Sequence, residues 1–542
     1  MKLPFPQSLL PLWLLALIWL VAPASAQVKD HIATLQTQSA ESNTNIWGHW
    51  GPDRDKYSTW TSHSNRLIPV YTFGMTLDSV NSANSLYRDE QRLSSLYGRL
   101  PSTTLNAGAE YFDQTDIYKL QKLAAEAGKK RIILFVFDGM DWHTTRAAAI
   151  AKSRQVGYQQ GRGSGLHFQD YRGTTTDFGF FVTSPHNEGT AINVDRQIVT
   201  NPGGKVAGGY DVSRGGATPW QVTSDLLYPI GKSETDPHAY TDSAASATSL
   251  CSGIKTYNDA INVDFSGREV LPIARTLQDE GYAIGIVTSV PISHATPASA
   301  YANNVHRDDY QDLTRDLLGI PSVFHPGGVP GVDVLIGAGW GEVKDQDGNQ
   351  GANFVVGNRY LTEDDFTRVS VDDGGKYVVA QRTAGEPGRA VLVTAVQQAI
   401  EGKHRLFGYF GVTGGHLPFR TADGDYAPVQ SVGNPATAKA EVYTPADLSE
   451  NVTLSDMALA AIEVLDSRPQ PWWLMVEAGD VDWGNHANNI DNSIGAVISG
   501  DNAFSKVTEW IEHHGGWDDT VLILTADHGH YLTIDKPEML AH

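Results

Sequence analysis

The chain has 542 residues, of which 41% are hydrophobic and 19% charged, a balance typical of a globular protein with a large core in one or two domains. Acidic residues outnumber basic ones by 62 to 40, and a net charge of −22 argues against nucleic acid and anionic membranes as partners. The single cysteine, Cys251, excludes an internal disulfide.

The first 26 residues are predicted to be a secretory signal peptide. Lys2 precedes an apolar run over 9–21, and the small residues at 24–26 form a cleavage site before Gln27. The alternative is an uncleaved membrane anchor, but the run is shorter than the roughly 20 residues that span a bilayer. We therefore expect a periplasmic or secreted protein that does not associate with the membrane after cleavage.

Residues 27–125 are polar and aromatic and are predicted to form an N-terminal extension of mostly irregular structure. The stretch DIYKLQKLAAEAGKK, residues 116–130, has the periodicity and the basic end of a helix. The remaining residues, 126–542, are predicted to form the main domain, with a loop-rich insert at about 340–470 that is marked by Gly, Asp and Pro turns.

Short apolar runs recur from residue 131 onward, separated by helical stretches. Because these runs are continuous rather than alternating, they indicate strands buried on both faces, and thus an α/β fold with a largely parallel central sheet flanked by helices. The predicted strands are RIILFVFDGM (131–140), YAIGIVTS (282–289), VDVLIGAG (332–339), RLFGYFG (405–411), WWLMVEAGDVD (472–482) and TVLILTADHGH (520–530).

Carboxylate and imidazole groups gather at the ends of these strands, where the chemistry of open α/β sheets is usually located. A lone Asp at such a place is often only a turn residue, but this group is larger. Two members four residues apart share one helical face and can hold one zinc, whereas oxygen-only ligands suit magnesium. The residues are Asp138, Glu477, Asp482, His486, Asp527 and His528, with Thr296 as a further oxygen ligand.

Asp242 and Ser243 stand directly before a run of Ala, Ser and Thr that reads as a helix. The start of a helix favours negative charge, because the helix dipole and free backbone N–H groups point towards it. The alternative interpretation is an ordinary N-cap Ser on a tightly packed helix.

The segment YTDSAASATSLCSGIKTYN resembles the nucleophile motif of alkaline phosphatases. Four further segments resemble that family in its own order: FVFDGM, HATPASAYANNVHRDDY, VEAGDVDWGNH and TADHGH. The resemblance extends from about residue 131 to the end of the chain and implies the alkaline-phosphatase-like sandwich, two Zn²⁺ ions, one Mg²⁺ ion and a homodimer.

Carried over by position, the resemblance implies that Ser243 is the nucleophile, that Arg307 binds phosphate and that Asp242 orients Arg307. It assigns the remaining residues to the metals. One zinc takes Asp138, Asp527 and His528, the other takes Asp482 and His486, and magnesium takes Asp138, Thr296 and Glu477, with His530 as a hydrogen-bond partner behind them.

Three positions depart from the family pattern. Trp483 stands where other members carry Lys or His, and His294 stands where some carry Asp. In the family, the zinc that corresponds to the one held by Asp482 and His486 also takes a third ligand, a histidine well beyond the TADHGH strand. In this sequence His542 is the only histidine after that strand. We therefore expect a chain that lacks C-terminal elements, with an uncovered sheet edge and with His542 as a substitute ligand to test.

The resemblance implies hydrolysis of phosphate monoesters to inorganic phosphate through a phosphoserine intermediate. Two alternatives stay open: a phosphodiesterase or sulfatase of the same superfamily, and a non-catalytic metal- or phosphate-binding protein. The implied partners are small phosphate monoesters.

Overall fold

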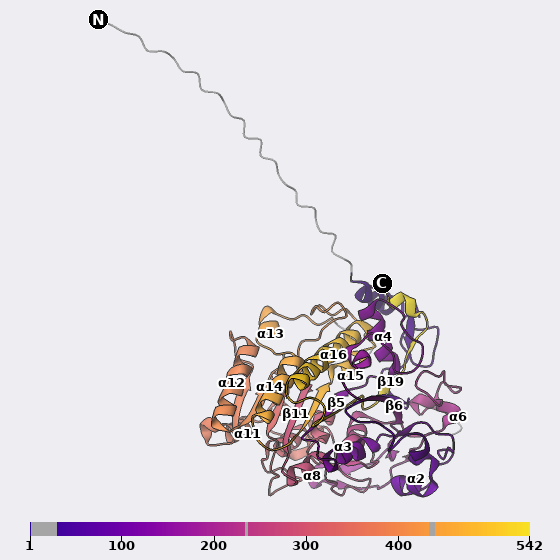
Figure 1. Cartoon of the computed structure of the whole chain (residues 1–542), viewed down its shortest axis with the longest axis horizontal. Helices are drawn as coiled ribbons and strands as arrows, with labels where there is room; N and C mark the ends of the chain where they lie inside the picture. Colours follow the sequence, from indigo (N-terminus) through magenta and orange to yellow (C-terminus); the bar gives the residue numbers. More distant parts are fainter. Residues whose placement is uncertain (2–29, 234–236, 433–439, 542) are drawn as a thin grey trace. The chain divides into compact units, whose positions relative to one another are not determined.

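The computed structural model describes residues 30–233, 237–432 and 440–541, together with Met1. The segment 1–26, predicted as a signal peptide, and the candidate ligand His542 lie outside the described residues, apart from Met1. Residues His31–His542 form one compact unit, and a ten-stranded sheet runs through it in the order β15-β16-β12-β11-β17-β5-β18-β3-β6-β4 (Figure 1).

All six predicted strands are confirmed, and they run parallel to one another in the sheet. Their residues are buried because helices cover both faces, which explains why the apolar runs do not alternate. The α/β class with a largely parallel central sheet is therefore confirmed. The strands are β5 (Arg131–Phe137), β11 (Ala283–Pro291), β12 (Val334–Ala338), β16 (Arg405–Tyr409), β17 (Trp472–Ala478) and β18 (Thr520–Thr525).

The N-terminal segment enters the sheet. Strand β3 (Ile68–Phe73) is fully buried and pairs antiparallel with both β18 and β6 (Thr176–Val182), and the short β4 (Phe112–Asp113) extends the sheet beyond β6. Within the described residues, β3 is the one antiparallel strand of this sheet. The expectation of an uncovered edge beyond β18 is therefore wrong, because β3 satisfies the backbone N–H and C=O groups there.

Two short strand pairs also join the N-terminal segment to the chain after β18. β1 (Gly48–Trp50) pairs antiparallel with β20 (Leu532–Ile534), and β2 (His63–Ser64) pairs antiparallel with β19 (Gly529–His530). The segment predicted as an extension is thus packed against the sheet's central strands.

Helices form a layer on each face of the sheet (Figure 1). One layer contains α4 (Trp142–Ser153), α12 (Gly388–Gly402), α14 (Leu454–Asp466) and α16 (Ile490–His513). The other contains α3 (Asp116–Glu126), α7 (Ser243–Ser252), α8 (Ile273–Asp279) and α9 (Ala295–Ser299). None of the helices in the described ranges combines the length and the hydropathy needed to cross a bilayer.

The region 340–470, predicted as an insert, combines loops with elements of the sheet and of one helix layer. It contributes β15 (Tyr377–Gln381) at the sheet edge, the predicted strand β16, and helices α12 and α14. The loop at 412–419 lies at the carboxyl end of β17, where the rings of His416 and Phe419 are near that of Trp483.

Candidate active site

The predicted strand-end residues converge because β17, β5 and β18 are parallel neighbours whose carboxyl ends open at one edge. Asp138 follows β5, and the bend after β18 brings Asp527 and His528 to the same place. Helix α15 (Asp480–His486) begins directly after β17 and carries Asp482 and His486 one turn apart on one face.

Ser243 is the first helical residue of α7, and Asp242 is its N-cap. The carboxylate Oδ1 of Asp242 accepts a hydrogen bond from the N–H of Ala245 at 2.9 Å, so the interpretation of Ser243 as the cap is wrong. The Ser243 hydroxyl is therefore not used for capping. It is 1% exposed, and its Oγ lies 3.0 Å from Nε2 of His528.

Asp138, Asp527 and His528 form a buried cluster beside Ser243, which we call the serine-side cluster. Nε2 of His528 lies 3.1 Å from Oδ1 of Asp138 and 3.6 Å from Oδ2 of Asp527. Burial raises the pKa of both carboxyls well above their usual range. The charges of Asp482 and Glu477 raise the pKa of Asp138 further, and the charge of Asp138 does the same for Asp527. Oδ1 of Asp138 and Oδ2 of Asp527 are buried without a hydrogen-bond partner. These two unpaired carboxylate oxygens and the imidazole of His528 form a set of ligands that fits a zinc ion.

An oxygen-only group lies next to this cluster. Thr296 Oγ1 lies 3.5 Å from Oδ2 of Asp138, and it also neighbours the carboxyl of Glu477. Burial raises the pKa of Glu477 to about 8. Its Oε1 has no hydrogen-bond partner, while Thr288, which was not predicted from sequence, donates to Oε2. A hydroxyl and two carboxylates fit magnesium.

Asp482 lies among imidazole rings in a second cluster. Its Oδ1 is 2.7 Å from Nε2 of His530, and its Oδ2 is 3.5 Å from Nε2 of His486. The ring of His63 lies 4.9 Å from that of His486 and 4.2 Å from that of His528, measured between centroids. Burial lowers the pKa of His530 to about 4 and that of His63 well below its usual value. Uncharged imidazoles beside a carboxylate fit a second zinc ion.

Arg307 lies beside the serine, and its Nη1 donates to Oδ2 of Asp242 at 3.0 Å. Although burial opposes charge, the carboxylate of Asp242 raises the pKa of Arg307 further above its usual value, so the guanidinium stays charged. Trp483 packs near His294, with ring centroids 5.5 Å apart, and burial lowers the pKa of His294 to about 3. These two side chains therefore bring aromatic, uncharged surface to the site.

The sequence of the chain is similar to that of one protein family. The alkaline phosphatase family is matched over residues 223–539, more than half of the chain. The chain belongs to the alkaline phosphatase family. Among the similar relatives, the alkaline phosphatase of Escherichia coli K12 is 30% identical over 325 residues, covering 58% of this chain and 63% of that protein. Alkaline phosphatase H of Pseudomonas aeruginosa is 28% identical over 322 residues, covering 58% and 62%.

This chain therefore matches less than two thirds of the length of each of these two alkaline phosphatases. Among solved structures, the cold-active alkaline phosphatase of Shewanella sp. is similar with a TM-score of 0.43 and 20% identity, covering 74% of this chain and 68% of that one.

The matched range contains the predicted site residues from Asp242 onward, whereas Asp138 and His63 precede it. The structure brings together every predicted site residue among those it describes. The sequence analysis missed His63 because it lies in a two-residue strand within a polar stretch, TSHSN, where no periodicity marks a buried position. Its proximity to the imidazoles around Asp482 follows from the tertiary fold.

Proposed function

We propose that this protein hydrolyses phosphate monoesters to inorganic phosphate through a phosphoserine intermediate. The observation that carries the proposal is the position of Ser243. This residue starts helix α7 and directly follows Asp242, the aspartate that holds Arg307. Its hydroxyl contacts His528 of the serine-side cluster. A nucleophile, a phosphate-binding cation and metal-ligating groups are thus assembled around one oxygen.

Three ions are proposed from the donor sets. Asp138, Asp527 and His528 would hold one zinc, Asp482 and His486 the other, and Asp138, Thr296 and Glu477 a magnesium. When bound, zinc ions at these places supply charge that lowers the pKa of the serine hydroxyl and stabilises the oxygens of the attacking and leaving groups.

The proposed reaction has two steps, and each is a displacement at phosphorus. In the first, Ser243 Oγ loses its proton and forms a bond to phosphorus while the bond from phosphorus to the ester oxygen breaks, and the alcohol leaves with a proton. In the second, water attacks the phosphoserine, the bond between Oγ and phosphorus breaks, and phosphate leaves. The hydroxyl of Ser243 is restored.

Arg307 and the start of α7 are positioned to bind the phosphoryl oxygens. Asp242 uses Oδ1 to cap the helix and Oδ2 to hold Arg307, so one carboxylate sets the positions of the guanidinium and the helix start. The guanidinium has further N–H donors that can bind two oxygens of a phosphate. The backbone N–H groups in the first turn of α7 add to this anion-binding place.

Turnover of a simple aryl phosphate, measured together with zinc per chain, tests the proposal. We expect turnover of the monoester, a trappable phosphoserine at position 243, and much slower turnover of an aryl phosphodiester and an aryl sulfate. Zinc binding without turnover would favour the non-catalytic alternative, and faster cleavage of the diester or the sulfate would favour the other enzymes of the superfamily.

We also propose an extracytoplasmic location, on the strength of the signal-peptide pattern in residues 1–26.

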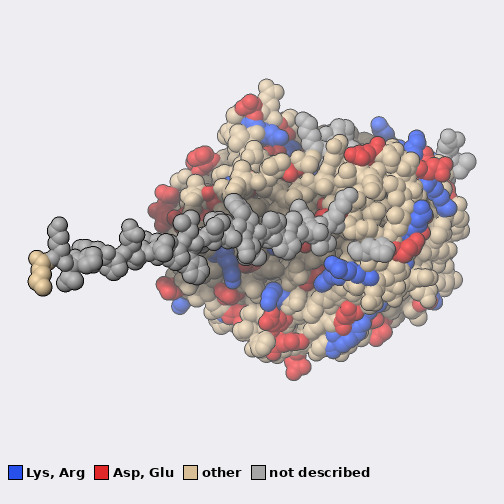
Figure 2. All heavy atoms as spheres, turned by 90° about the horizontal axis from the view of Figure 1, so that it is seen from above, with Lys and Arg blue, Asp and Glu red and all other residues tan. Residues whose placement is uncertain are grey.

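The negative net charge opposes an anionic substrate only weakly, because charges beyond about 10 Å are screened at 0.1 M salt. Figure 2 shows acidic and basic side chains interspersed on one face, outside the grey atoms. The charge within the site itself therefore dominates substrate binding.

A further inference from the structure

We propose that His63, supplied by the N-terminal segment, is the third protein ligand of the metal held by Asp482 and His486. The proposal rests on the proposed two-zinc function. The resemblance places the third ligand, a histidine, beyond the TADHGH strand, whereas His63 precedes every other ligand in the chain and lies outside the range matched to the family.

Strand pairing places His63 at the second cluster. β2 and β19 pair so that His63 lies opposite His530 and Ser64 lies opposite Gly529. Ser64 Oγ also donates to the carbonyl oxygen of His530 at 3.1 Å, which fixes this register. A nitrogen of His63 then lies within 4.8 Å of ligand atoms of both Asp482 and His528, while His486 and His530 form a second such group with Asp482. Asp482 belongs to both groups, and the rings of His63 and His486 are neighbours, with centroids 4.9 Å apart.

The same segment orients a second ligand. Nδ1 of His486 lies 2.5 Å from the carbonyl oxygen of Thr61, two residues before His63, so Nδ1 carries the proton and donates it. Nε2 of His486 is thereby left with its lone pair, on the side that faces Asp482. Metal-ligating histidines commonly donate their other N–H in this manner, which fixes the tautomer and the ring.

His530 is the competing candidate, and its hydrogen bonding argues against it. Its Nε2 lies 2.7 Å from Oδ1 of Asp482, the distance of a charge-assisted hydrogen bond in which the imidazole donates. That nitrogen therefore supports the carboxylate rather than a metal. In His63, Ser62 Oγ lies 3.4 Å from Nδ1, and within the described part of the chain Nε2 has no hydrogen-bond partner. His63 thus offers the freer lone pair.

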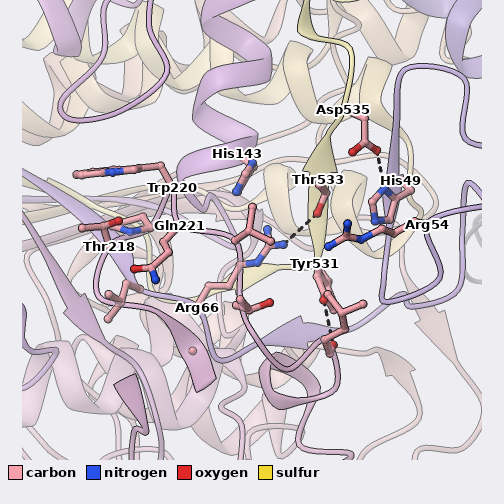
Figure 3. A pocket seen from close by; sticks show the side chains of 16 residues that line it. His49, Arg54, Arg66, His143, Thr218, Trp220, Gln221, Tyr531, Thr533 and Asp535 are labelled. Atoms are coloured by element: carbon pink, nitrogen blue, oxygen red, sulfur yellow. Dashed lines mark hydrogen bonds and ion pairs between the residues drawn. The ribbon is translucent and has the colours of Figure 1, made fainter. Parts of the chain in front are cut away.

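Residues before and after His63 contact the chain after β18 (Figure 3). His49 contacts Asp535 at 2.9 Å, and Arg66 donates to Thr533 Oγ1 at 3.3 Å across a cavity of about 110 Å³. Asn488, just after α15, donates to the carbonyl oxygen of Trp60 at 2.9 Å. With contacts before and after it, His63 is held in a defined position, as a metal ligand requires.

The test uses the full chain with His63→Ala, His530→Gln and His325→Ala, the last as a histidine that is paired with carboxylates, those of Asp316 and Glu269, outside the cluster. Zinc per chain is measured after gel filtration, and zinc affinity by competition with a chelator. We expect two zincs in the parent, His530→Gln and His325→Ala, but one in His63→Ala. Its second site should weaken by more than about 100-fold, beyond the 10- to 100-fold loss typical of a supporting hydrogen-bond partner.

A thiolate replacement provides a test that is independent of folding losses and of activity. In His63→Cys loaded with Co²⁺, a cysteine ligand produces a thiolate-to-metal charge-transfer absorption, and the parent supplies the baseline because its Cys251 is buried in α7. Two zincs at parental affinity in His63→Ala, loss of the zinc in His530→Gln instead, or no new absorption in His63→Cys would each overturn the assignment. A parent that binds fewer than two zincs would refute the two-zinc function itself.

Discussion

Replacing Arg307 with alanine should weaken phosphate binding strongly while leaving the fold intact. The guanidinium is held by Asp242, the residue directly before Ser243, and its loss should remove charge-assisted hydrogen bonds to the phosphoryl oxygens. Asp242 does not become an orphaned carboxylate, because its Oδ1 still accepts from Ala245 and its Oδ2 from the N–H of Asp259 at 3.1 Å. The substitution should therefore weaken phosphate binding and have little effect on the free energy of unfolding.

The magnitude is worked from one hydrogen bond between the guanidinium and a phosphoryl oxygen, the least that the substitution removes. A hydrogen bond to a charged group contributes about 1.5–3 kcal/mol, and about 1.4 kcal/mol corresponds to a tenfold change in affinity. The inhibition constant of inorganic phosphate should therefore rise by about 10- to 100-fold. Turnover should slow without disappearing, since the metal-ligating groups remain.

Steady-state hydrolysis of an aryl phosphate, with inorganic phosphate as the competing inhibitor, measures both effects. Arg307→Lys keeps the charge but loses the two-pronged geometry, so its values should lie between those of the parent and of Arg307→Ala. Arg315→Ala serves as the matched control, because Arg315 is also paired with carboxylates, those of Asp312 and Asp365. An inhibition constant within twofold of the parent in Arg307→Ala would refute this role.

Three further outcomes are expected. Ser243→Ala should lower kcat by at least about 1,000-fold and abolish phosphoserine while zinc content stays the same, and activity within a few fold of the parent would contradict its role as nucleophile. Trp483→Lys should tighten phosphate inhibition, since an ammonium replaces an indole with one N–H donor, and weaker inhibition would count against it. Burial raises the pKa of Asp116 from its usual 3.8 to about 7. As pH rises between these values, the carboxyl loses its proton in the unfolded chain but keeps it in the folded chain. The free energy of unfolding should therefore fall over this range. In urea titrations with EDTA present, Asp116→Asn should lose less stability than the parent between about pH 4 and pH 7, and identical losses would refute this linkage.

Most of the central sheet could be predicted from the sequence. A run such as RIILFVF must be buried on both faces, and this local pattern indicates a strand of a parallel sheet whatever its neighbours are. The positions of Asp138, Asp527 and His528 follow from the same reasoning, because the carboxyl ends of parallel strands share one edge. The sequence could not predict that Asp242 is the N-cap of α7. Asp and Ser are both favoured at this position, and only the geometry shows which of the two residues occupies it.

The sequence by itself therefore determined the class of sheet, the edge at which the chemistry collects and the residue types available there. The tertiary structure alone decided that β3 lies between β18 and β6, and that His63 lies beside His486 and His528. The physical reason is that strand pairing over such a sequence separation depends on which backbone edge is left unpaired when the core forms. The local periodicity of IPVYTF or of TSHSN carries no information about that partner.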